Sequence, residues 1–230
     1  MNYFLLDNIP LEIQSDHLYA FLKIKPKSRF AGEFGDLLTE AAGIARPKAI
    51  YKLSTVEEND GDSVKIDGLR VDSRVVKINL NGRGRVFPFV ATCGSEIEIW
   101  AGGLESRLQR FWADAIQLFA LGQAIDAMKH DLQDRFETGS TSSMNPGSLQ
   151  DWPIKGLQTI FSIVGQAYEQ TGVQLNGSLM MKPLKSAAGL EFESEEKFYN
   201  CQLCPRSECS MRRAPYNDHL YQSKYQVHEK

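Results

Sequence analysis

The sequence predicts an α+β fold in which an antiparallel sheet is packed with long helices. Two stretches, residues 27–44 and 104–136, repeat apolar side chains at the spacing of one helix face. The stretches that read as strands do not alternate with helices in the regular way of a doubly wound parallel sheet. Together these observations favour an antiparallel sheet covered by helices.

Length and composition are those of an ordinary globular protein. The chain has 230 residues, of which 42% are hydrophobic and 24% charged, so it can build the core of one elaborated domain. Its pI of about 5.9 disfavours nucleic-acid binding. No apolar run is long enough to cross a bilayer, and residues 1–10 lack a secretory signal. We therefore expect a cytoplasmic protein that binds neither nucleic acid nor membrane.

The first elements expected along the chain are one helix and one strand. Residues 27–44 form the helix, which Arg46-Pro47 ends because proline disfavours helical backbone in the residue before it. Residues 49–53 read as a strand. The acidic stretch of residues 57–63 is rich in turn formers and is expected to be a connection.

Residues 74–92 predict an antiparallel pair of strands. Residues 74–80 alternate in the manner of a half-buried strand, and residues 86–92 form a mostly apolar one. Asn81-Gly82-Arg83-Gly84 between them has the composition of a hairpin turn. Pro88 cannot donate a hydrogen bond to a neighbouring strand, which favours an edge or a bulge at that position.

The long helix of residues 104–136 is expected at the centre of the core, with Gly122 as a site for a bend. After it, residues 138–148 form a loop of mostly small side chains. A last long helix is expected from residues 151–153, whose Asp-Trp-Pro suits a first turn, to about residue 170.

Gly172 is the expected stop of that last helix. Short strands are predicted near residues 178–181 and 189–192. A cysteine segment and a polar tail rich in tyrosine follow, and the tail is expected to be poorly ordered.

The segment before the last long helix has the chemistry of a ligand site. Gly147 permits close approach of a ligand to the backbone, and Asn145 and Ser148 supply neutral hydrogen-bonding groups. The helix that follows presents free N–H groups suited to a carboxylate. The alternative is a capped helix entry that binds no ligand.

An ordered series of motifs runs through the C-terminal part of the chain. It consists of Thr92-Cys93-Gly94-Ser95-Glu96, Thr171-Gly172-Val173-Gln174-Leu175-Asn176, Met180 to Pro183, Ser186, Gly189, Phe192 and Lys197-Phe198-Tyr199. In this order the motifs resemble the activation domain of cobalamin-dependent methionine synthase. The resemblance covers residues 90–209, and the chain is similar to a stand-alone relative of that domain.

The resemblance implies binding of S-adenosylmethionine and a role in the reductive methylation of a corrinoid. The implied binding residues are Asn145, Pro146, Gly147, Ser148, Ser186, Gly189 and Tyr199. For Tyr199 the alternative is a packed aromatic side chain with its hydroxyl at the surface. Residues 143–148 take the place of an Arg-Pro-Ala-Pro-Gly-Tyr loop of the family, and Ser143 replaces its arginine. A contact to a ligand carboxylate must therefore come from elsewhere in the chain or be lost.

Three cysteines are compact enough to converge on one metal centre. Cys201, Cys204 and Cys209 follow the spacing Cys-x2-Cys-x4-Cys, and soft thiolates select zinc, copper(I) or an iron-sulfur cluster. An iron-sulfur cluster would take Cys93 as its fourth ligand or leave one iron open, and Cys93, His219 and His228 are the candidates for zinc. An iron-sulfur site is our hypothesis, with structural zinc and three unligated thiols as the alternatives.

Three parts of the chain follow from these patterns. Residues 1–90 are expected to form an N-terminal α/β part of the same domain, residues 91–200 the core with the ligand loop, and residues 201–230 the cysteine cluster and polar tail. The chain lacks a cobalamin-binding Asp-x-His-x-x-Gly motif, so a partner must carry the corrinoid. That partner is expected to be methionine synthase or a related methyltransferase. The competing functions are an iron-sulfur redox or electron-transfer protein and a zinc-stabilised interaction module.

Overall fold

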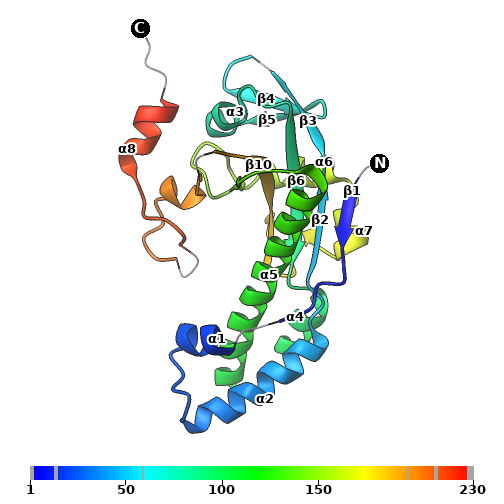
Figure 1. Ribbon diagram of the computed structural model, residues 1–230, viewed down its shortest axis with the longest axis vertical. Coiled ribbons are helices and arrows are strands. Elements are labelled where there is room, and N and C mark those ends of the chain that lie inside the picture. The colour runs from blue at the N-terminus through cyan, green and yellow to red at the C-terminus, as the bar shows by residue number, and fades with distance from the viewer. Residues whose placement is uncertain (1–2, 13–14, 59, 196, 210–211, 227–230) are drawn as a thin grey trace.

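A computed structural model describes residues 3–12, 15–58, 60–195, 197–209 and 212–226 (Figure 1). Within these ranges, eight strands form one antiparallel sheet in the order β1-β2-β6-β3-β4-β5, and β10 pairs with both β6 and β7. The strands of this sheet are β1 (Tyr3–Leu6), β2 (Lys48–Lys52), β3 (Ser54–Glu58), β4 (Ser63–Ile66), β5 (Leu69–Asp72), β6 (Arg85–Thr92), β7 (Thr141–Met144) and β10 (Ser186–Glu193). The predicted α+β fold with its antiparallel sheet is confirmed.

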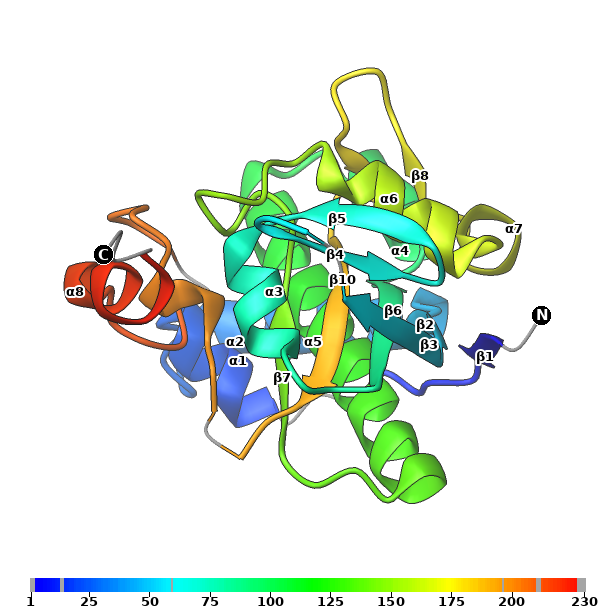
Figure 2. The ribbon, with the colours of Figure 1, turned by 90° about the horizontal axis from the view of Figure 1, so that it is seen from above.

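Helices cover both faces of this sheet (Figure 2). The helices are α1 (Ser15–Leu22), α2 (Arg29–Ile44), α3 (Arg74–Leu80), α4 (Ser95–Gly103), α5 (Arg107–Phe136), α6 (Gly156–Val164), α7 (Ala167–Thr171) and α8 (Asp218–Leu220). A second, small sheet pairs β8 (Gln174–Leu175) with β9 (Met181–Lys182). A 3₁₀ turn, η1 (Asn200–Gln202), and a π turn, η2 (Tyr221–Tyr225), lie in the C-terminal segment. None of the helices in the described ranges has the length and apolarity needed to span a bilayer.

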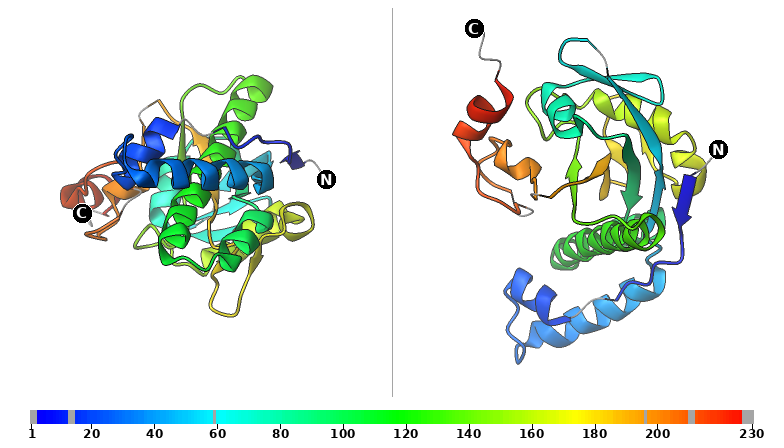
Figure 3. Two further views of the ribbon diagram at one scale, coloured as in Figure 1. Left: turned by 90° about the horizontal axis from the view of Figure 1, so that it is seen from below. Right: turned by 45° about the horizontal axis from the view of Figure 1, so that its top comes forward.

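The long helix α5 lies between the sheet and α2, as Figure 3 shows. Ser106 caps its first turn by accepting a hydrogen bond from the Gln109 N–H, which satisfies one of the free donors there. The helix runs without interruption through Gly122. Its buried face includes Trp112, Ile116 and Met128, which pack with α2 and one face of β2 and β6. The predicted position of this helix at the centre of the core is correct.

The opposite face of the sheet is covered by α3, α6, α7 and the C-terminal segment. Leu157, Ile160 and Val164 on α6 pack there against the sheet. Tyr225 is fully buried in the same cluster and donates a hydrogen bond from its hydroxyl to Asn79 Oδ1 at 3.0 Å. The described tail residues are therefore anchored on the body at Tyr225, contrary to the expectation of poor order, and residues 210–211 and 227–230 of the tail lie outside the described residues.

Residues 74–80 form helix α3, so the predicted strand is wrong. The Ser73 side chain accepts a hydrogen bond from the Val76 N–H and starts the helix. The buried residues are Val75, Val76, Asn79 and Leu80, a spacing that fits one helix face as well as the alternation fits a strand. The predicted antiparallel pair is wrong with it, and residues 81–84 connect α3 to β6 instead of closing a hairpin.

Strand β6 is central, so the edge or bulge predicted from Pro88 is also wrong. Its neighbours are β2, β3 and β10. Pairing with β2 ends at Tyr51 opposite Phe89 and resumes with β3 at Ser54 opposite Val86, in unchanged register. Pro88 lies at this interruption on the side of β2 and β3, and on the other side it is in register with Leu190 of β10.

The remaining differences concern short elements. Residues 57–63, expected as a connection, contain the end of β3 and the start of β4. The helix expected to about residue 170 is divided, because Gly165 at φ +84° ends α6 before α7 begins, and Gly172 at φ +76° then ends α7 as predicted. Residues 189–192 lie within β10, whereas the strand expected near 178–181 starts only at Met181.

Candidate functional site

The site is built around the point where β7 leaves the sheet. β7 pairs with β10 up to Met144 opposite Leu190, and the chain then turns away toward α6. Gly189 allows this close approach, because a Cβ at that position would lie 2.3 Å from the Met144 carbonyl oxygen and 2.5 Å from Asn145 Nδ2. The absence of a side chain at residue 189 thus places the start of the loop directly on β10.

The predicted ligand loop, residues 145–148, is held at both of its ends by hydrogen bonds. Asn145 Nδ2 donates to the Ala188 carbonyl oxygen at 2.9 Å, and the Ser148 N–H donates to the Asn145 carbonyl oxygen at 3.2 Å. Gly147 takes φ +80°, which glycine adopts without strain, and its N–H donates to the Trp152 carbonyl oxygen at 2.8 Å. Because Trp152 is buried in the core, the loop is fixed before any ligand arrives.

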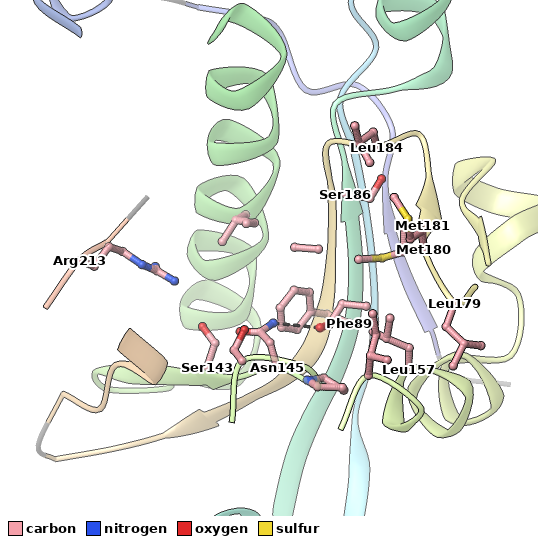
Figure 4. Close-up of a pocket in the computed structure, with 16 residues that line it drawn as sticks. Phe89, Ser143, Asn145, Leu157, Leu179, Met180, Met181, Leu184, Ser186 and Arg213 are labelled. Atoms are coloured by element: carbon pink, nitrogen blue, oxygen red, sulfur yellow. Dashed lines mark hydrogen bonds between the residues drawn. The ribbon is translucent and has the colours of Figure 1, made fainter. Parts of the chain in front are cut away.

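A cavity of about 370 Å³ lies beside this loop (Figure 4). One part of its wall is apolar and includes Phe89, Leu157 and Met180. The loop and β10 supply the neutral polar groups of Ser143, Asn145, Ser148 and Ser186. Figure 4 shows Ser143 and Arg213 toward one side of the cavity and Leu179 and Met180 toward the other. The cavity is therefore amphipathic along its length.

The predicted binding residues fall around three neighbouring cavities. Asn145, Pro146, Ser148 and Ser186 line the first one directly. Gly147 lines a second cavity on the other side of the loop, and Gly189 lies behind Asn145 in β10. Ser186 is oriented by its hydroxyl, which lies 2.9 Å from Thr92 Oγ1 and donates to the Pro183 carbonyl oxygen at 2.7 Å.

Tyr199 pairs with Ser143 through a single bridge parallel to β7. It lines a third cavity, of about 210 Å³, together with Lys129 and Lys197. The residue is half-buried and does not line the first cavity. Its neighbour Asn200 brings its side-chain amide within 2.7 Å of that of Asn145, so the segment that carries Tyr199 contacts the loop.

Several lining residues escaped the sequence analysis. Leu157 reads as an ordinary core position of an amphipathic helix, and Met180 was noted only as part of a motif. Arg213 lies in the polar tail, 65 or more residues beyond the loop in sequence, and nothing near it in the sequence points to a cavity. Only the path of the folded chain brings it to the site.

The cysteines divide into two places. Cys201, Cys204 and Cys209 line the second cavity, of about 560 Å³, on the side of the loop that carries Gly147. Cys93 is buried at the end of β6 in the cluster formed with α2 and α5, and it lines none of the three cavities. Burial, together with the nearby Glu98, raises the pKa of the Cys93 thiol to about 12. The structure does not bring Cys93 to the other three thiols.

The histidine candidates do not complete a metal centre in the described chain. His219 is exposed and lies beside Asp218, and His228 is outside the described residues. Among the residues that the structure describes, no three His, Cys, Asp or Glu side chains are gathered closely enough to hold a metal ion.

Comparison with known proteins identifies the fold. No protein-family model matches the sequence, and no curated protein matches it. Among solved structures, the chain is similar to the MetH reactivation domain bound to AdoHcy, with a TM-score of 0.64 and 13% identity. The match covers 86% of this chain and 81% of that one. At this identity the likeness shows the fold, and the predicted resemblance to an activation domain is confirmed at that level.

Proposed function

We propose that this protein binds S-adenosylmethionine and serves in the reductive methylation of a corrinoid carried by another protein. One observation carries the proposal. The amphipathic cavity beside residues 145–148 lies in a fold shared with a domain that was solved bound to AdoHcy, or S-adenosylhomocysteine. Neither the cavity nor the fold alone favours this ligand, but together they support it.

The chemistry of the cavity fits an adenosyl ligand. A purine ring buries apolar surface, for which Phe89, Leu157 and Met180 provide the wall. A ribose and an amino-acid group need hydrogen-bonding partners, which Asn145, Ser148 and Ser186 supply without bringing in a charge. No acidic side chain lines this cavity among the described residues, so nothing there repels the ligand carboxylate.

The proposed reaction transfers one electron and one methyl group to the corrinoid. An external reductant gives one electron to Co(II) of the partner's corrinoid, and the resulting Co(I) takes the methyl group from the sulfonium of S-adenosylmethionine. The carbon–sulfur bond breaks, a carbon–cobalt bond forms, and S-adenosylhomocysteine is left in the cavity. The role of this chain is to position the sulfonium, since the reacting groups carry the chemistry.

Calorimetry tests the binding step. We expect saturable heat with S-adenosylhomocysteine, and we expect Ser148→Trp to abolish it, because the indole would project from the wall into a cavity of about 370 Å³ and take space that the ligand needs. Ser178→Trp is the matched control, since Ser178 is exposed and lines none of the three cavities. No heat and no thermal shift with the wild-type protein at saturating ligand would end the proposal.

The methyl-transfer step needs a separate experiment. The protein is mixed without oxygen with S-adenosylmethionine, a chemical reductant and the corrinoid-binding part of a methionine synthase that lacks its own activation domain. We expect the Co(II) absorption to be replaced by that of methylcobalamin only when this protein is present. An equal rate without it would show that it binds the nucleoside but does not serve this partner.

The three clustered cysteines support a second proposal, a thiolate metal site. Its support is that Cys201, Cys204 and Cys209 line one cavity next to the ligand loop. These thiols would have to close around the ion, since they are not gathered at metal-binding distances in the described chain. Iron and zinc analysis after purification without oxygen tests it. A metal-free protein whose three thiols are all alkylated under native conditions would contradict it.

A further inference from the structure

Arg213 is the single charged side chain that lines the first cavity among the described residues. The other lining groups are apolar side chains, prolines and neutral polar groups. Arg213 also lines the second and third cavities, so it lies at the place where all three meet. Figure 4 shows its guanidinium pointing from the C-terminal segment toward the space between Ser143 and α5.

The neighbouring arginine has a different role. Arg212 donates hydrogen bonds to four carbonyl oxygens, those of Cys201, Cys204, Arg206 and Ala214. These bonds tie the cysteine segment into a closed loop. The backbone N–H of Arg213 then donates to Cys201 Sγ at 3.4 Å, which sets where its side chain begins. The Arg212 guanidinium therefore stabilises the cysteine segment, whereas the Arg213 side chain projects from that segment.

The Arg213 guanidinium has no hydrogen-bond or ion-pair partner among the described residues. Other cations near the site are less suited to a ligand. Lys129 lines only the third cavity and is paired at 3.1 Å with Glu191, whose side chain is fully buried. Lys197 also lines the third cavity and not the first. A cation with five donors and no protein acceptor thus stands at one side of an otherwise uncharged cavity.

We infer that Arg213 binds the carboxylate of the adenosyl ligand and fixes its direction in the cavity. The inference rests on the proposed function. The carboxylate lies at the Ser143 and Arg213 side, and the adenine lies against the apolar wall at Leu157 and Met180. A guanidinium and a carboxylate form two parallel charge-assisted hydrogen bonds, which are stronger than neutral ones. The C-terminal segment, which is distant in sequence from the loop, is thereby part of the binding site.

Two ligands and four proteins test this inference. The ligands are S-adenosylhomocysteine and its decarboxylated analogue, which differ only in the carboxylate. The proteins are the wild type, Arg213→Ala, Arg213→Lys and the control Arg206→Ala. Arg206 is on the same segment and lines the second cavity but not the first. Calorimetry gives the dissociation constant of each pair, and circular dichroism verifies that each variant is folded.

We expect Arg213→Ala to lower the affinity for S-adenosylhomocysteine about tenfold or more. The affinity for the decarboxylated analogue should stay within about twofold of the wild-type value. Arg213→Lys keeps the charge but not the paired geometry, so it should recover part of the loss. Arg206→Ala should bind both ligands as the wild type does. The wild type itself should prefer the ligand with the carboxylate.

Other outcomes distinguish a failure of the proposed function from a failure of the proposed role of Arg213. If the wild type binds neither ligand, the proposed function fails. If the wild type binds S-adenosylhomocysteine and Arg213→Ala binds it equally well, the proposed function stands and the role of Arg213 is overturned. An equal loss for both ligands also overturns it, because Arg213 would then act only by holding the segment in place.

Discussion

The side-chain amides of Asn145 and Asn200 lie 2.7 Å apart, although 55 residues separate them in sequence. Asn145 begins the ligand loop, and Asn200 begins the short turn that carries the cysteine segment. This contact joins the two pieces of chain that surround the three cavities.

Asn145→Ala should loosen the ligand loop. The change removes the hydrogen bond to the Ala188 carbonyl oxygen at 2.9 Å and the contact with Asn200. We expect the free energy of unfolding to fall by about 1–2 kcal/mol and the affinity for S-adenosylhomocysteine to fall with it. Urea unfolding and calorimetry measure the two effects. Gln150→Ala, at an exposed position two residues after the loop, should change neither.

Gly189→Ala should separate β7 from β10. The added methyl would lie 2.3 Å from the Met144 carbonyl oxygen, and a backbone atom cannot move aside as a flexible side chain does. We expect destabilisation of about 2 kcal/mol or more in urea unfolding, together with weaker ligand binding. At Gly177 an added Cβ meets nothing within 4 Å, so Gly177→Ala serves as the control. Equal stability of the two variants would contradict the packing described at residue 189.

Cys93 should make the protein less stable as the pH rises above 9. Burial raises the pKa of this thiol to about 12 from an ordinary value of 9.0, so the folded state keeps its proton where the unfolded chain releases it. The stabilising contribution is complete below pH 9 and is lost as the pH rises toward 12. The slope is at most about 1.4 kcal/mol per pH unit.

Urea unfolding at pH 8, 9 and 10 under reducing conditions measures this slope. Cys93→Ala should make the slope of the unfolding free energy against pH shallower, because the thiol that ionises in the unfolded chain is gone. The matched control is Cys209→Ala, which removes an exposed thiol and shows whether the loss of any cysteine changes the slope. Burial also raises the pKa of Tyr51, Tyr221 and Tyr225, which add to the slope above pH 9, so the difference in slope between the wild type and Cys93→Ala reports on the thiol. An unchanged slope in Cys93→Ala would assign the effect to another group.

Tyr225→Ala should release the C-terminal segment from the body. The Tyr225 ring is fully buried against α3, its hydroxyl donates to Asn79 Oδ1, and its carbonyl oxygen accepts from Arg74 Nε. Loss of the ring packing and of the hydroxyl hydrogen bond should raise the rate of tryptic cleavage after Arg212 and Arg213 at least about tenfold, since cleavage follows local opening.

The same variant should keep the body of the protein folded, because the core cluster between α5 and the sheet contains no tail residue and the cluster on the opposite face is built mostly by the sheet, α3, α6 and α7. Mass spectrometry of the first fragments identifies the cut. Tyr216→Ala, at an exposed tyrosine on the same segment, should be cleaved at the wild-type rate. If both variants are cleaved alike, Tyr225 is not the anchor of the segment.

The periodicity of apolar residues predicted the long helices correctly but not the secondary structure of the short segments. Residues 27–44 and 104–136 repeat their apolar side chains over many turns, so the helical period is unmistakable there, and α2 and α5 confirm it. Residues 74–80 are too few to distinguish a helix face from a strand, and the cap at Ser73 together with packing against the sheet decided for the helix.

The sequence by itself determined the fold class, the two long helices, the helix stop at Gly172 and the identity of the loop that lines the first cavity. These features depend on side chains that are neighbours along the chain or along one helix. Tertiary structure alone decided that β6 is central, that Cys93 is apart from the other thiols, and that Arg213 reaches the ligand loop. Those relations arise from contacts between distant segments, which form only when the apolar faces of sheet and helices are buried together, and no local pattern encodes them.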